Sequence, residues 1–600
     1  MPITGFAALA AALSVGGSPV DLVTPSDRQA TYCNPINVDY GYTPIPNFAE
    51  QGRHRATADP VIVLFKGDYY LFSTNQWGYW WSHDMVSWHF VARHFLRPEH
   101  KVYDDLCAPA VWVMDDKLYV IGSTYADNFP IWVSSNPKTD DWHEAVHEFK
   151  MGGWDPAWFV DDDGRLYLYH GSSNIYPIYG TEIDRKTFQP IGEHKELIHL
   201  HDEEHGWERF GEANDNTFLR PFMEGAWMSK HGGKYYLQYG APGTEFSGYG
   251  DGVYVSDHPL GPFEYQPHNP FAYKPGGFAR GAGHGATFQD RDQNWWHVST
   301  ITIAVKNSFE RRLGIWPTAF DADGIMQCDT AFGDYPTYLP KRTPADPHQA
   351  GSFTGWMLLN YNKPVKVSST LGGYHANFAV NESIRDYWSA RTGGPNEWIQ
   401  SDLGDLSTVR AVQINFADQD AEFLGKQTGT YHQYRLYASK DGHKWDLIAD
   451  KSKNRTDVPH DYIELSRPIE ARYVKLENLQ MPTGKFAISG LRVFGLGHGK
   501  VPDPVKGFVP LRADKVPGKE YNGQSADRRN AWLKWAQSDD ATGYLIRCGI
   551  APDKLYTSVM VYGSNEYYFR AMDKSRTYYF QIQAFNENGI SAPTTVSKSE

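Results

Sequence analysis

The chain has 600 residues, of which 15% are aromatic and only 21% are charged, with 55 Gly and 37 Pro. Frequent Gly and Pro with many Tyr and Trp are typical of short strands joined by tight turns, so the composition excludes a disordered, collagen-like or coiled-coil protein and favours an all-β fold. The formal net charge of −14 argues against nucleic acid as a partner, whereas many aromatic rings with an acidic excess are common where sugars bind.

Residues 1–30 are predicted to be an N-terminal tail or a signal-like segment. The apolar run Phe6–Val15 is too short to span a bilayer and resembles the apolar part of a secretory signal, although no Lys or Arg precedes Arg28. We therefore expect a secreted or periplasmic protein without a membrane span, with a plain N-terminal tail as the alternative. The four cysteines show no CxxC or CxxH spacing, so neither a disulfide framework nor a zinc site is indicated.

Residues 31–345 are predicted to form a five-bladed β-propeller, because one pattern recurs five times within them. Each copy has a small or special residue, alternating apolar residues, a turn rich in Asp, Gly or Asn, and a second aromatic-rich strand, which is the pattern of a β-hairpin. Hairpins repeated at such intervals, with further strand-like segments between them, match four-stranded propeller blades. The copies are ADPVIVLFKGDYYLFS from Ala58, APAVWVMDDKLYVIGS from Ala108, WDPAWFVDDDGRLYLYH from Trp154, MEGAWMSKHGGKYYLQY from Met223 and GHGATFQDRDQNWWHVS from Gly283.

The residue that opens each repeat is predicted to face the central channel, because the first strand of each blade lines the propeller axis. Singly, each has an ordinary interpretation as a turn cap, a solvated carboxylate or a structural histidine. Their equivalent placement favours a functional cluster, because buried like charges are costly unless chemistry or a ligand uses them. The Asp-rich run 161–164 lacks the spacing of a calcium loop and is predicted to be a hairpin turn. The five opening residues are Asp59, Ala108, Asp155, Glu224 and His284.

These motifs resemble glycoside hydrolase family 43, whose members are five-bladed propellers that act as inverting glycosidases on arabinan, xylan and related glycans. The resemblance covers about Tyr32 to Leu339. It is carried by ADP in the first repeat, WDPAWFVDDDGRLYL in the third, MEGAW in the fourth, GAGHGATFQD in the fifth, and RRLGIWPTAFDADG near the closing strand.

The resemblance implies a role for each opening residue. Asp59 is expected to be the general base, Glu224 the general acid, and Asp155 the residue that orients the acid and raises its pKa. His284 resembles the family's axial histidine, which can hold a structural Ca²⁺ ion in the channel, often through water; no other cofactor is expected. An inverting hydrolysis needs the base and acid carboxyls on opposite faces of the sugar, roughly 6.5–9.5 Å apart to admit a water molecule.

Residues beside the openings are candidates for substrate contacts. Trp154 and Phe222 adjoin catalytic positions, and Trp77, Trp80 and Trp81 flank the first repeat, although inter-blade packing is the competing interpretation for each ring. Arg311 or Arg312 offers donors for a sugar hydroxyl, with an exposed cation as the alternative. One departure from the family lies after the acid, where Glu224 is followed by Gly225 and Ala226 instead of the common Gly-Pro.

Two further domains are predicted after the Pro-rich stretch that ends before Gly351. Residues 351–497 resemble a discoidin-like (coagulation factor type C) jelly roll; Asn381 stands where Asp is common, so a buttressing role is favoured over sugar binding. Residues 502–600 resemble a fibronectin type III sandwich with Trp535 in its core and Tyr578 near the start of a late strand, and a spacer or packing role is expected.

The predicted function is an inverting exo-glycosidase that hydrolyses terminal bonds of plant or microbial polysaccharides, of the α-L-arabinofuranosidase or β-xylosidase type. The partner is an oligo- or polysaccharide. A β-galactosidase or galactofuranosidase of the same family, a non-catalytic glycan-binding propeller and a related retaining fructosidase are the alternatives. The ADP motif argues against the fructosidase, whose nucleophile loop reads Asn-Asp-Pro. Sequence pattern fixes neither the sugar nor the oligomeric state.

Overall fold

The repeats fold as antiparallel hairpins in a computed structural model that describes residues 29–95, 106–123, 130–149, 153–339, 352–515 and 526–599. In the first repeat, strand β2 (Val61–Phe65) pairs with β3 (Asp68–Phe72). The turn between them places Lys66 and Gly67 at φ angles of 49° and 83°. Two consecutive positive φ angles are the mark of a type I′ turn, whose twist matches that of the flanking strands.

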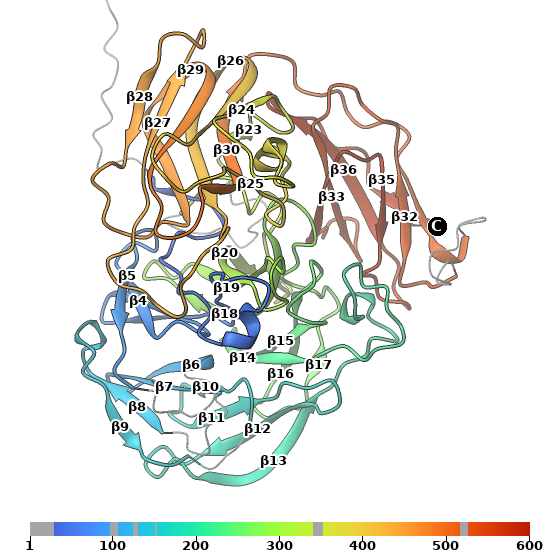
Figure 1. Cartoon of the computed structure of the whole chain (residues 1–600). Coiled ribbons are helices and arrows are strands. Elements are labelled where there is room, and N and C mark those ends of the chain that lie inside the picture. The colour runs from blue at the N-terminus through green and yellow to red at the C-terminus, as the bar shows by residue number, and fades with distance from the viewer. Residues whose placement is uncertain are drawn as a thin grey trace, which may run out of the picture.

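Two more antiparallel strands extend each hairpin, which gives five four-stranded blades in chain order (Figure 1). Blade one contains β2, β3, β4 (Gly78–Ser82) and β5 (His89–Ala92). Blade two contains β6 (Cys107–Met114), β7 (Lys117–Ser123), β8 (Ile131–Ser134) and β9 (His143–Val146). Blade three contains β10 (Ala157–Val160), β11 (Leu166–His170), β12 (Ile178–Ile183) and β13 (Pro190–Ile198). Blade four contains β14 (Glu224–His231), β15 (Lys234–Ala241), β16 (Gly250–Ser256) and β17 (Glu264–Tyr265). Blade five contains β18 (Arg280–Gln289), β19 (Trp295–Thr302), β20 (Arg311–Phe320) and β21 (Met326–Cys328).

Apolar clusters between neighbouring blades close the ring. Ile62 of blade one and Val298 of blade five belong to one buried cluster, and the stacked rings of Trp112 and Trp158 join blades two and three with centroids 4.6 Å apart. Strand β1 (Thr31–Tyr32) pairs with β22 (Thr337–Tyr338), which brings both ends of the propeller together. The predicted all-β class and five-bladed propeller are confirmed, and the Asp-rich run 161–164 is the turn between β10 and β11.

The second domain is an antiparallel jelly roll around its own apolar core. Its two longest strands, β26 and β29, pair antiparallel along most of their length, with two shifts in register. Figure 1 shows it above the propeller in yellow and orange. Its strands are β23 (Met357–Leu358), β24 (Val365–Val367), β25 (Trp388–Ser389), β26 (Trp398–Phe416), β27 (Gln433–Ser439), β28 (Asp446–Asp450), β29 (His460–Gln480) and β30 (Ala487–Gly497).

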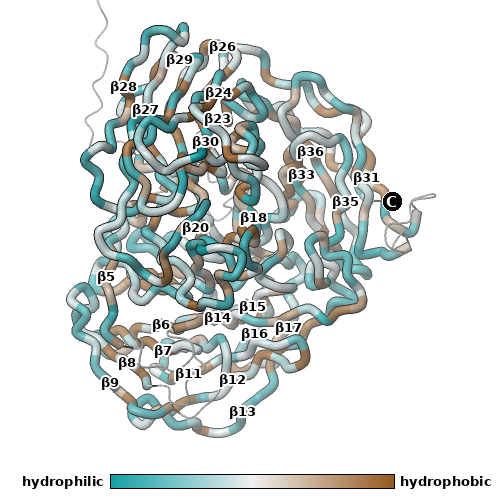
Figure 2. The backbone as a smooth tube through the Cα atoms, in the orientation of Figure 1, coloured by the Kyte–Doolittle hydropathy of each residue, from teal (hydrophilic) through white to brown (hydrophobic). Residues whose placement is uncertain are grey.

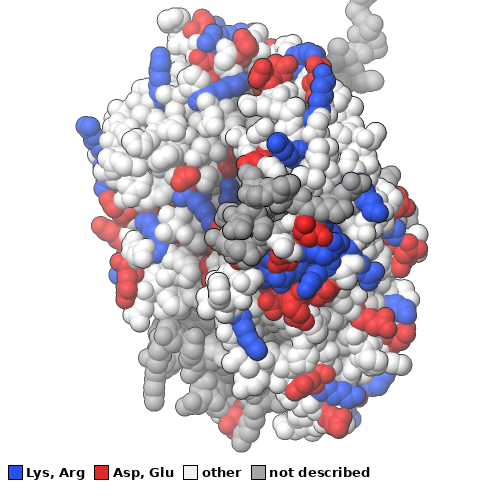
Figure 3. Space-filling view, turned by 90° about the vertical axis from the view of Figure 1, so that its right-hand side faces the viewer, with Lys and Arg blue, Asp and Glu red and all other residues white. Residues whose placement is uncertain are grey.

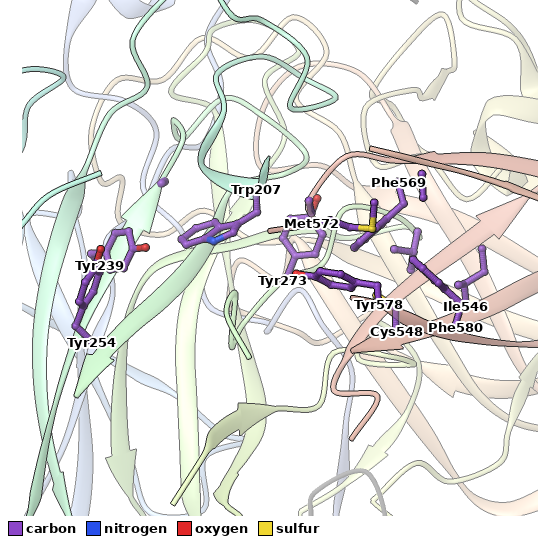
Figure 4. Close-up of a cluster of buried hydrophobic side chains, with 14 of the residues drawn as sticks. Trp207, Tyr239, Tyr254, Tyr273, Ile546, Cys548, Phe569, Met572, Tyr578 and Phe580 are labelled. Carbon is purple, nitrogen blue, oxygen red and sulfur yellow. The ribbon is translucent and has the colours of Figure 1, made fainter. Parts of the chain in front are cut away.

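The third domain is a sandwich of two antiparallel sheets, shown in red in Figure 1. Trp535 is buried in its core. The same buried cluster includes propeller residues, and Figure 4 shows Trp207 and Tyr273 between the blade-four residues Tyr239 and Tyr254 and the third-domain residues Met572 and Tyr578. One sheet contains β31 (Val509–Arg512), β32 (Ala531–Lys534) and β35 (Glu566–Phe569), and the other contains β33 (Gly543–Gly549), β34 (Thr557–Tyr562), β36 (Tyr579–Asn586), β37 (Gly589–Ile590) and β38 (Ser597–Lys598).

Buried ion pairs fix the second domain on the propeller. The Arg55 guanidinium binds the carboxylates of Asp418 and Asp457, and all three side chains are at most 8% exposed. Arg312 joins this network through Asp418, at 3.2 Å, and through a hydrogen bond to His460, at 3.0 Å. Asp418 is the carboxylate partner of Arg312 in this network, so removing Asp418 would leave the Arg312 guanidinium buried without its counter-charge.

A propeller segment that includes the short helix η4 (Gly206–Glu208) docks on the third domain. His205 bonds Asp573 at 2.7 Å, and the N–H of Gly206 donates to the carbonyl of Met572 at 3.0 Å. The remaining helices are also single 3₁₀ turns, and no α-helix occurs in the part of the chain that the structure describes. They are η2 (Pro46–Ala49), η3 (Pro137–Thr139), η6 (Ala376–Val380) and η7 (Ala513–Lys515).

Apolar and polar stretches alternate along the chain in all three domains (Figure 2), and acidic and basic side chains are interspersed over the face shown in Figure 3. Among the described residues, no helix has the length and apolar character needed to cross a bilayer. The apolar run Phe6–Val15 lies outside the described residues. All four cysteines are free thiols.

Candidate active site

Four of the five opening residues share a left-handed backbone conformation. Asp59, Ala108, Asp155 and His284 have φ angles of 51°, 42°, 55° and 44°. Such angles cost a non-glycine residue on the order of 1–3 kcal/mol, and they cluster where surrounding structure dictates a functional geometry. In blade four the positive φ falls one residue later, on Gly225 at 66°. A Cβ at Gly225 would lie 2.7 Å from the His284 ring, so a side chain has no room there.

Hydroxyl groups from neighbouring blades hold these backbones in place. The N–H of Asp59 donates to Thr300 Oγ1 at 3.0 Å, and the N–H of Asp155 donates to Ser123 Oγ at 2.8 Å. The N–H of Ala108 donates in the same way to Thr74 Oγ1 at 2.7 Å. In each case the acceptor lies at or near the end of the second strand of the preceding blade, so these three opening residues are each held by the blade before them.

The last two openings depart from this pattern. The N–H of His284 donates to the buried carboxylate of Asp251 at 2.8 Å. At Glu224 the hydroxyl of the preceding blade binds the side chain, since Ser172 donates to Glu224 Oε2 at 3.3 Å. Tyr249 donates to Glu224 Oε1 at 2.5 Å. Two donors therefore orient the carboxyl of Glu224 toward the channel.

Asp59 lies among groups that favour its ionised form. Burial raises the pKa of its carboxyl, but the Arg311 guanidinium, the His284 imidazole and the hydrogen bond from Thr74 together hold the pKa below its ordinary value. Arg311 lies 3.6 Å from Asp59 Oδ1, and Thr74 donates to Oδ2 at 2.6 Å. Asp59 is therefore a carboxylate throughout the neutral pH range.

The surroundings of Asp155 favour its protonated form instead. Burial, together with the nearby carboxylates of Glu224 and Asp59, raises its pKa to about 7, against the lowering effects of His284 and of a hydrogen bond from Ser172. The hydroxyl of Ser172 thus lies between Asp155 and Glu224 and contacts both. Two carboxyls in one buried place cannot both ionise cheaply, so this pair keeps a proton near neutral pH. The raised pKa lies on Asp155, the more buried of the two.

His284 stands between the two sides of the site. Its Nδ1 lies 3.3 Å from Asp59 Oδ1 and 3.7 Å from Asp155 Oδ2. Burial lowers its pKa, but the surrounding carboxylates outweigh burial and the net pKa is raised. Asp155, Glu224 and His284 also offer atoms within 4.8 Å of one another. Calcium takes six to eight ligands, mostly oxygen, so these three atoms fit a water-mediated ion and not a direct protein cage.

The two arginines predicted as alternatives have different positions. Arg311 is 6% exposed, donates to Thr244 Oγ1 at 2.8 Å and faces Asp59. Arg312 does not face the channel, because adjacent residues of strand β20 point to opposite sides. Its guanidinium is buried in the network with Asp418 and His460. The structure therefore contradicts Arg312 as a sugar ligand and makes it part of the domain interface.

The predicted aromatic residues also divide into two groups. Trp154 and Phe222 are 38% and 39% exposed beside the carboxylates, so their rings are open to a ligand. Trp80 is fully buried and Trp81 packs under the Lys138 ammonium, as inter-blade packing predicts. The ring of Trp77 lies against Gly425 of the second domain, where a Cβ would come within 2.3 Å of it. Trp77 is thus a domain contact.

Sequence reasoning missed the groups that position the acids. A hydroxyl residue stands at the same place in four of the repeats, at or near the end of the second strand, and comparing the repeats at that place is a signal that leads to Thr74, Ser123, Ser172 and Thr300. Tyr249 has no such signal, because it comes from a loop outside the hairpins. Together these groups produce an ionised carboxylate on one side of the channel and a proton-holding pair on the other, which suits acid–base chemistry.

Comparison with known proteins identifies two domains. The profile of glycosyl hydrolases family 43 matches residues 54–326, and that of the F5/8 type C domain matches residues 364–489. A beta-xylosidase of Xylanibacter ruminicola is 26% identical over 245 residues, which are 36% of this chain and 70% of the relative. A xylosidase/arabinosidase 43A of Humicola insolens is 27% identical over 270 residues, 35% of this chain and 78% of the relative. An arabinoxylan arabinofuranohydrolase of Paenibacillus polymyxa is 30% identical over 164 residues, 25% and 24% of the two chains.

Proposed function

We propose that the chain is a glycoside hydrolase, because its residues 54–326 match the family 43 model, and that it is an inverting, exo-acting enzyme that releases a terminal pentose from a glycan. Asp59 acts as the general base, Glu224 as the general acid, and Asp155 shares the proton of the acid side. The observation that supports these roles is the opposite pKa shift of Asp59 and Asp155 across one channel.

In the proposed reaction Asp59 accepts a proton from a water molecule as that water attacks the anomeric carbon. On the other face, Glu224 donates its proton to the departing glycosidic oxygen, and the C–O bond to the leaving group breaks. The charge that develops on the ring is that of an oxocarbenium ion. Because water attacks opposite the leaving group in a single displacement, the released sugar has the inverted configuration.

The pentose assignment rests on the names of the relatives, which combine xylosidase and arabinosidase activities. A panel of 4-nitrophenyl α-L-arabinofuranoside, β-D-xylopyranoside, β-D-galactopyranoside and β-D-galactofuranoside tests it. We expect the highest kcat/KM on one of the two pentosides. A galactoside as the best substrate would refute the specificity for a pentose but not the glycoside hydrolase activity. Proton NMR of the first-formed anomer tests inversion, and a retained anomer would contradict the base role of Asp59.

For the channel ion, we propose a Ca²⁺ held by His284 and by the neighbouring carboxylates through water. The ion would add positive charge beside Asp59 and Asp155 and brace the centre of the ring. Dialysis against EDTA followed by Ca²⁺ addition is expected to lower and then restore the thermal unfolding midpoint. Identical unfolding with EDTA and with Ca²⁺ would refute the site.

For the other domains, we propose that the F5/8 type C domain is a buttress and that the third domain is a fibronectin type III-like packing module. The buried network of Arg55 with Asp418 and Asp457 supports the first role. The second is supported by the two-sheet sandwich and by Tyr578, whose hydroxyl accepts the N–H of Asp573 at 3.0 Å, as in the tyrosine corner of such sandwiches.

A further inference from the structure

One loop of blade four lies against the catalytic acid. It joins β15 to β16 and contains residues 242–249. Tyr249, at its end, is buried and donates its hydroxyl to Glu224 Oε1 at 2.5 Å. Near its start the carbonyl of Thr244 accepts the hydroxyl of Thr302 at 2.8 Å, which fixes this end on blade five. The stretch between Thr244 and Tyr249 therefore determines how the tyrosine meets the acid.

The middle of this loop is tied to a glutamate that follows η4. The N–H of Ser247 donates to Glu212 Oε2 at 2.9 Å, and the hydroxyl of Ser247 donates to Glu212 Oε1. The N–H of Tyr249 donates to the carbonyl of Phe246 at 3.1 Å, and the N–H of Phe246 donates to the carbonyl of Gly243 at 3.2 Å. Because these turns follow one another, a shift at Ser247 also shifts the backbone of Tyr249.

An arginine of the second domain completes this anchor from outside the propeller. Arg385 donates through Nη1 to Glu212 Oε1 at 2.8 Å and through Nη2 to the carbonyl of Glu245 at 3.2 Å. One guanidinium thus binds the loop itself and the carboxylate that holds the loop. The side chains of Arg385 and Glu212 are 25% and 48% exposed. An ion pair this exposed adds little to stability, so its effect is expected in the geometry of the loop.

The segment that carries Arg385 is itself fixed on the propeller. The preceding residue, Ile384, is 5% exposed and belongs to a buried apolar cluster with the propeller residue Ile303. Glu382 forms a buried ion pair with Arg492 at 2.8 Å. Arg385 therefore reaches the loop from a rigid support, as a positioning group must.

We propose that Arg385 is a positioning residue for the reaction, and that the second domain acts through it on the catalytic acid. This role rests on the proposed function, because it concerns how Glu224 is aimed at the leaving oxygen. Arg385 holds the middle of the loop so that Tyr249 keeps the carboxyl of Glu224 in place. The N–H of Ala282 also binds the carbonyl of Tyr249, at 2.8 Å, so loss of Arg385 misplaces the tyrosine without releasing it.

The test uses the whole chain and two substrates that share a sugar and differ in the leaving group. These are the 4-nitrophenyl and 2,4-dinitrophenyl glycosides of whichever sugar the wild type hydrolyses best. In Arg385→Met we expect kcat on the 4-nitrophenyl glycoside to fall about tenfold, because a misplaced acid protonates the leaving oxygen less efficiently. The fall should be no more than about twofold with the 2,4-dinitrophenyl group, which departs without protonation. Arg385→Lys, which keeps a cation and a donor, should recover part of the loss.

A double-variant cycle tests whether Arg385 acts through Tyr249. In Tyr249→Phe the ratio of kcat, 4-nitrophenyl over 2,4-dinitrophenyl glycoside, should already be lower than in wild type. Adding Arg385→Met should then lower the ratio by less than about twofold, because the contact through which the arginine acts is already lost. Full additivity of the two substitutions would contradict the proposal.

Arg472→Met is the matched control. Arg472 binds Asp402 of its own domain through two bonds of 2.9 and 3.0 Å, so this variant loses an ion pair of the second domain away from the loop and should keep the wild-type ratio. Glu212→Ala breaks the anchor from the propeller side and should lower the ratio as Arg385→Met does.

Two results would overturn the positioning role and leave the proposed function intact. One is an unchanged ratio in both Arg385→Met and Glu212→Ala, with active wild type. The other is an effect of Arg385→Met confined to KM, which would mean that the arginine binds substrate and does not position the acid. A wild type that hydrolyses no glycoside of the panel would instead overturn the proposed function and the role of Arg385 with it.

Discussion

Asp59 and Asp155 occupy equivalent positions in blades one and three, and yet their pKa values shift in opposite directions. Both precede proline, both have a left-handed backbone with φ near 50°, and both donate their N–H to a hydroxyl of the preceding blade. Nevertheless the pKa of Asp59 is lowered and that of Asp155 is raised to about 7. The repeat therefore fixes geometry, whereas the neighbours of each blade determine protonation.

The difference comes from the charged groups next to each carboxyl. Asp59 faces the Arg311 guanidinium at 3.6 Å, and a cation favours the ionised form. Asp155 shares its place with Glu224, and the Asp59 carboxylate adds to the repulsion. His284 touches both and so does not distinguish them. A cyclic fold that repeats one motif thus obtains an ionised carboxyl and a protonated one from the same residue type.

The largest expected effect comes from removing either partner of the proton transfers. In Glu224→Gln we expect kcat on nitrophenyl glycosides to fall roughly 10²–10⁴-fold, because the side chain no longer donates a proton to the leaving oxygen. The fall should be much smaller with a 2,4-dinitrophenyl leaving group, which departs without protonation. In Asp59→Asn the fall should be of similar size with both leaving groups, since activation of water is lost in either case.

Glu245→Gln is the control for both variants. The pKa of Glu245 is raised by burial and by the proximity of Glu224, so it lies near the same charges, but no hydrogen bond joins its carboxyl to the three acids among the described contacts. We expect its kcat to stay within about tenfold of wild type. Equal sensitivity of Glu224→Gln and Asp59→Asn to the leaving group would remove the distinction between the acid and base sides.

Much of this comparison was predictable from the sequence. Alternation of apolar residues with I′-type turns is local information, so five hairpins and their opening residues follow from the repeat. The protonation states of Asp59 and Asp155 could not be predicted from the repeat, because they depend on partners such as Arg311 that are distant in the chain and meet only when the ring closes. The hydroxyls of Thr74 and Ser172 were also missed, because Ser and Thr at strand ends are ordinary in any β protein.

The second prediction removes the cation that separates the two carboxyls. In Arg311→Met the pKa of Asp59 should rise, because burial then acts without its main opposing charge. A base works above its pKa, so the acidic limb of the kcat/KM–pH profile should move to higher pH by about one unit or more. Arg311→Lys, which restores a cation, should return the limb most of the way. A limb that stays in place in Arg311→Met would show that Arg311 does not set the charge of Asp59.

Neighbouring residues in sequence can have unrelated roles, which limits what sequence alone predicts. Arg311 and Arg312 were equivalent candidates until strand β20 placed one toward the channel and the other toward the second domain. Trp77 was a candidate sugar platform because it flanks the first repeat, but Gly425 of the second domain lies against its ring. Both misassignments arise from docking between domains, which no local pattern encodes.

The third prediction concerns the basic limb of the same profile. The proton shared by Asp155 and Glu224 should give wild type a falling limb near pH 7, since burial and like charge raise the pKa of Asp155 to about 7. In Asp155→Asn one carboxyl of the pair is gone and with it the repulsion that retains the proton. The falling limb should therefore move to lower pH, and kcat/KM at pH 7 should drop about tenfold. A limb that moves to higher pH would contradict a shared proton.

The smallest effect is expected from the hydroxyl that contacts both members of the pair. Ser172→Ala removes the hydrogen bond to Glu224 Oε2, 3.3 Å long, and the one that lowers the pKa of Asp155. The pKa of Asp155 should then rise, so the falling limb moves to higher pH, opposite to the shift in Asp155→Asn. A hydrogen bond to a charged group contributes about 1.5–3 kcal/mol, but 3.3 Å is long for one, so we expect kcat to fall only about threefold.

Thr74→Val is the matched variant on the other side: it removes the 2.6 Å bond to Asp59 and should move the acidic limb, leaving the basic limb in place. Opposite limbs moved by two equivalent hydroxyls would establish that each blade tunes its own carboxyl.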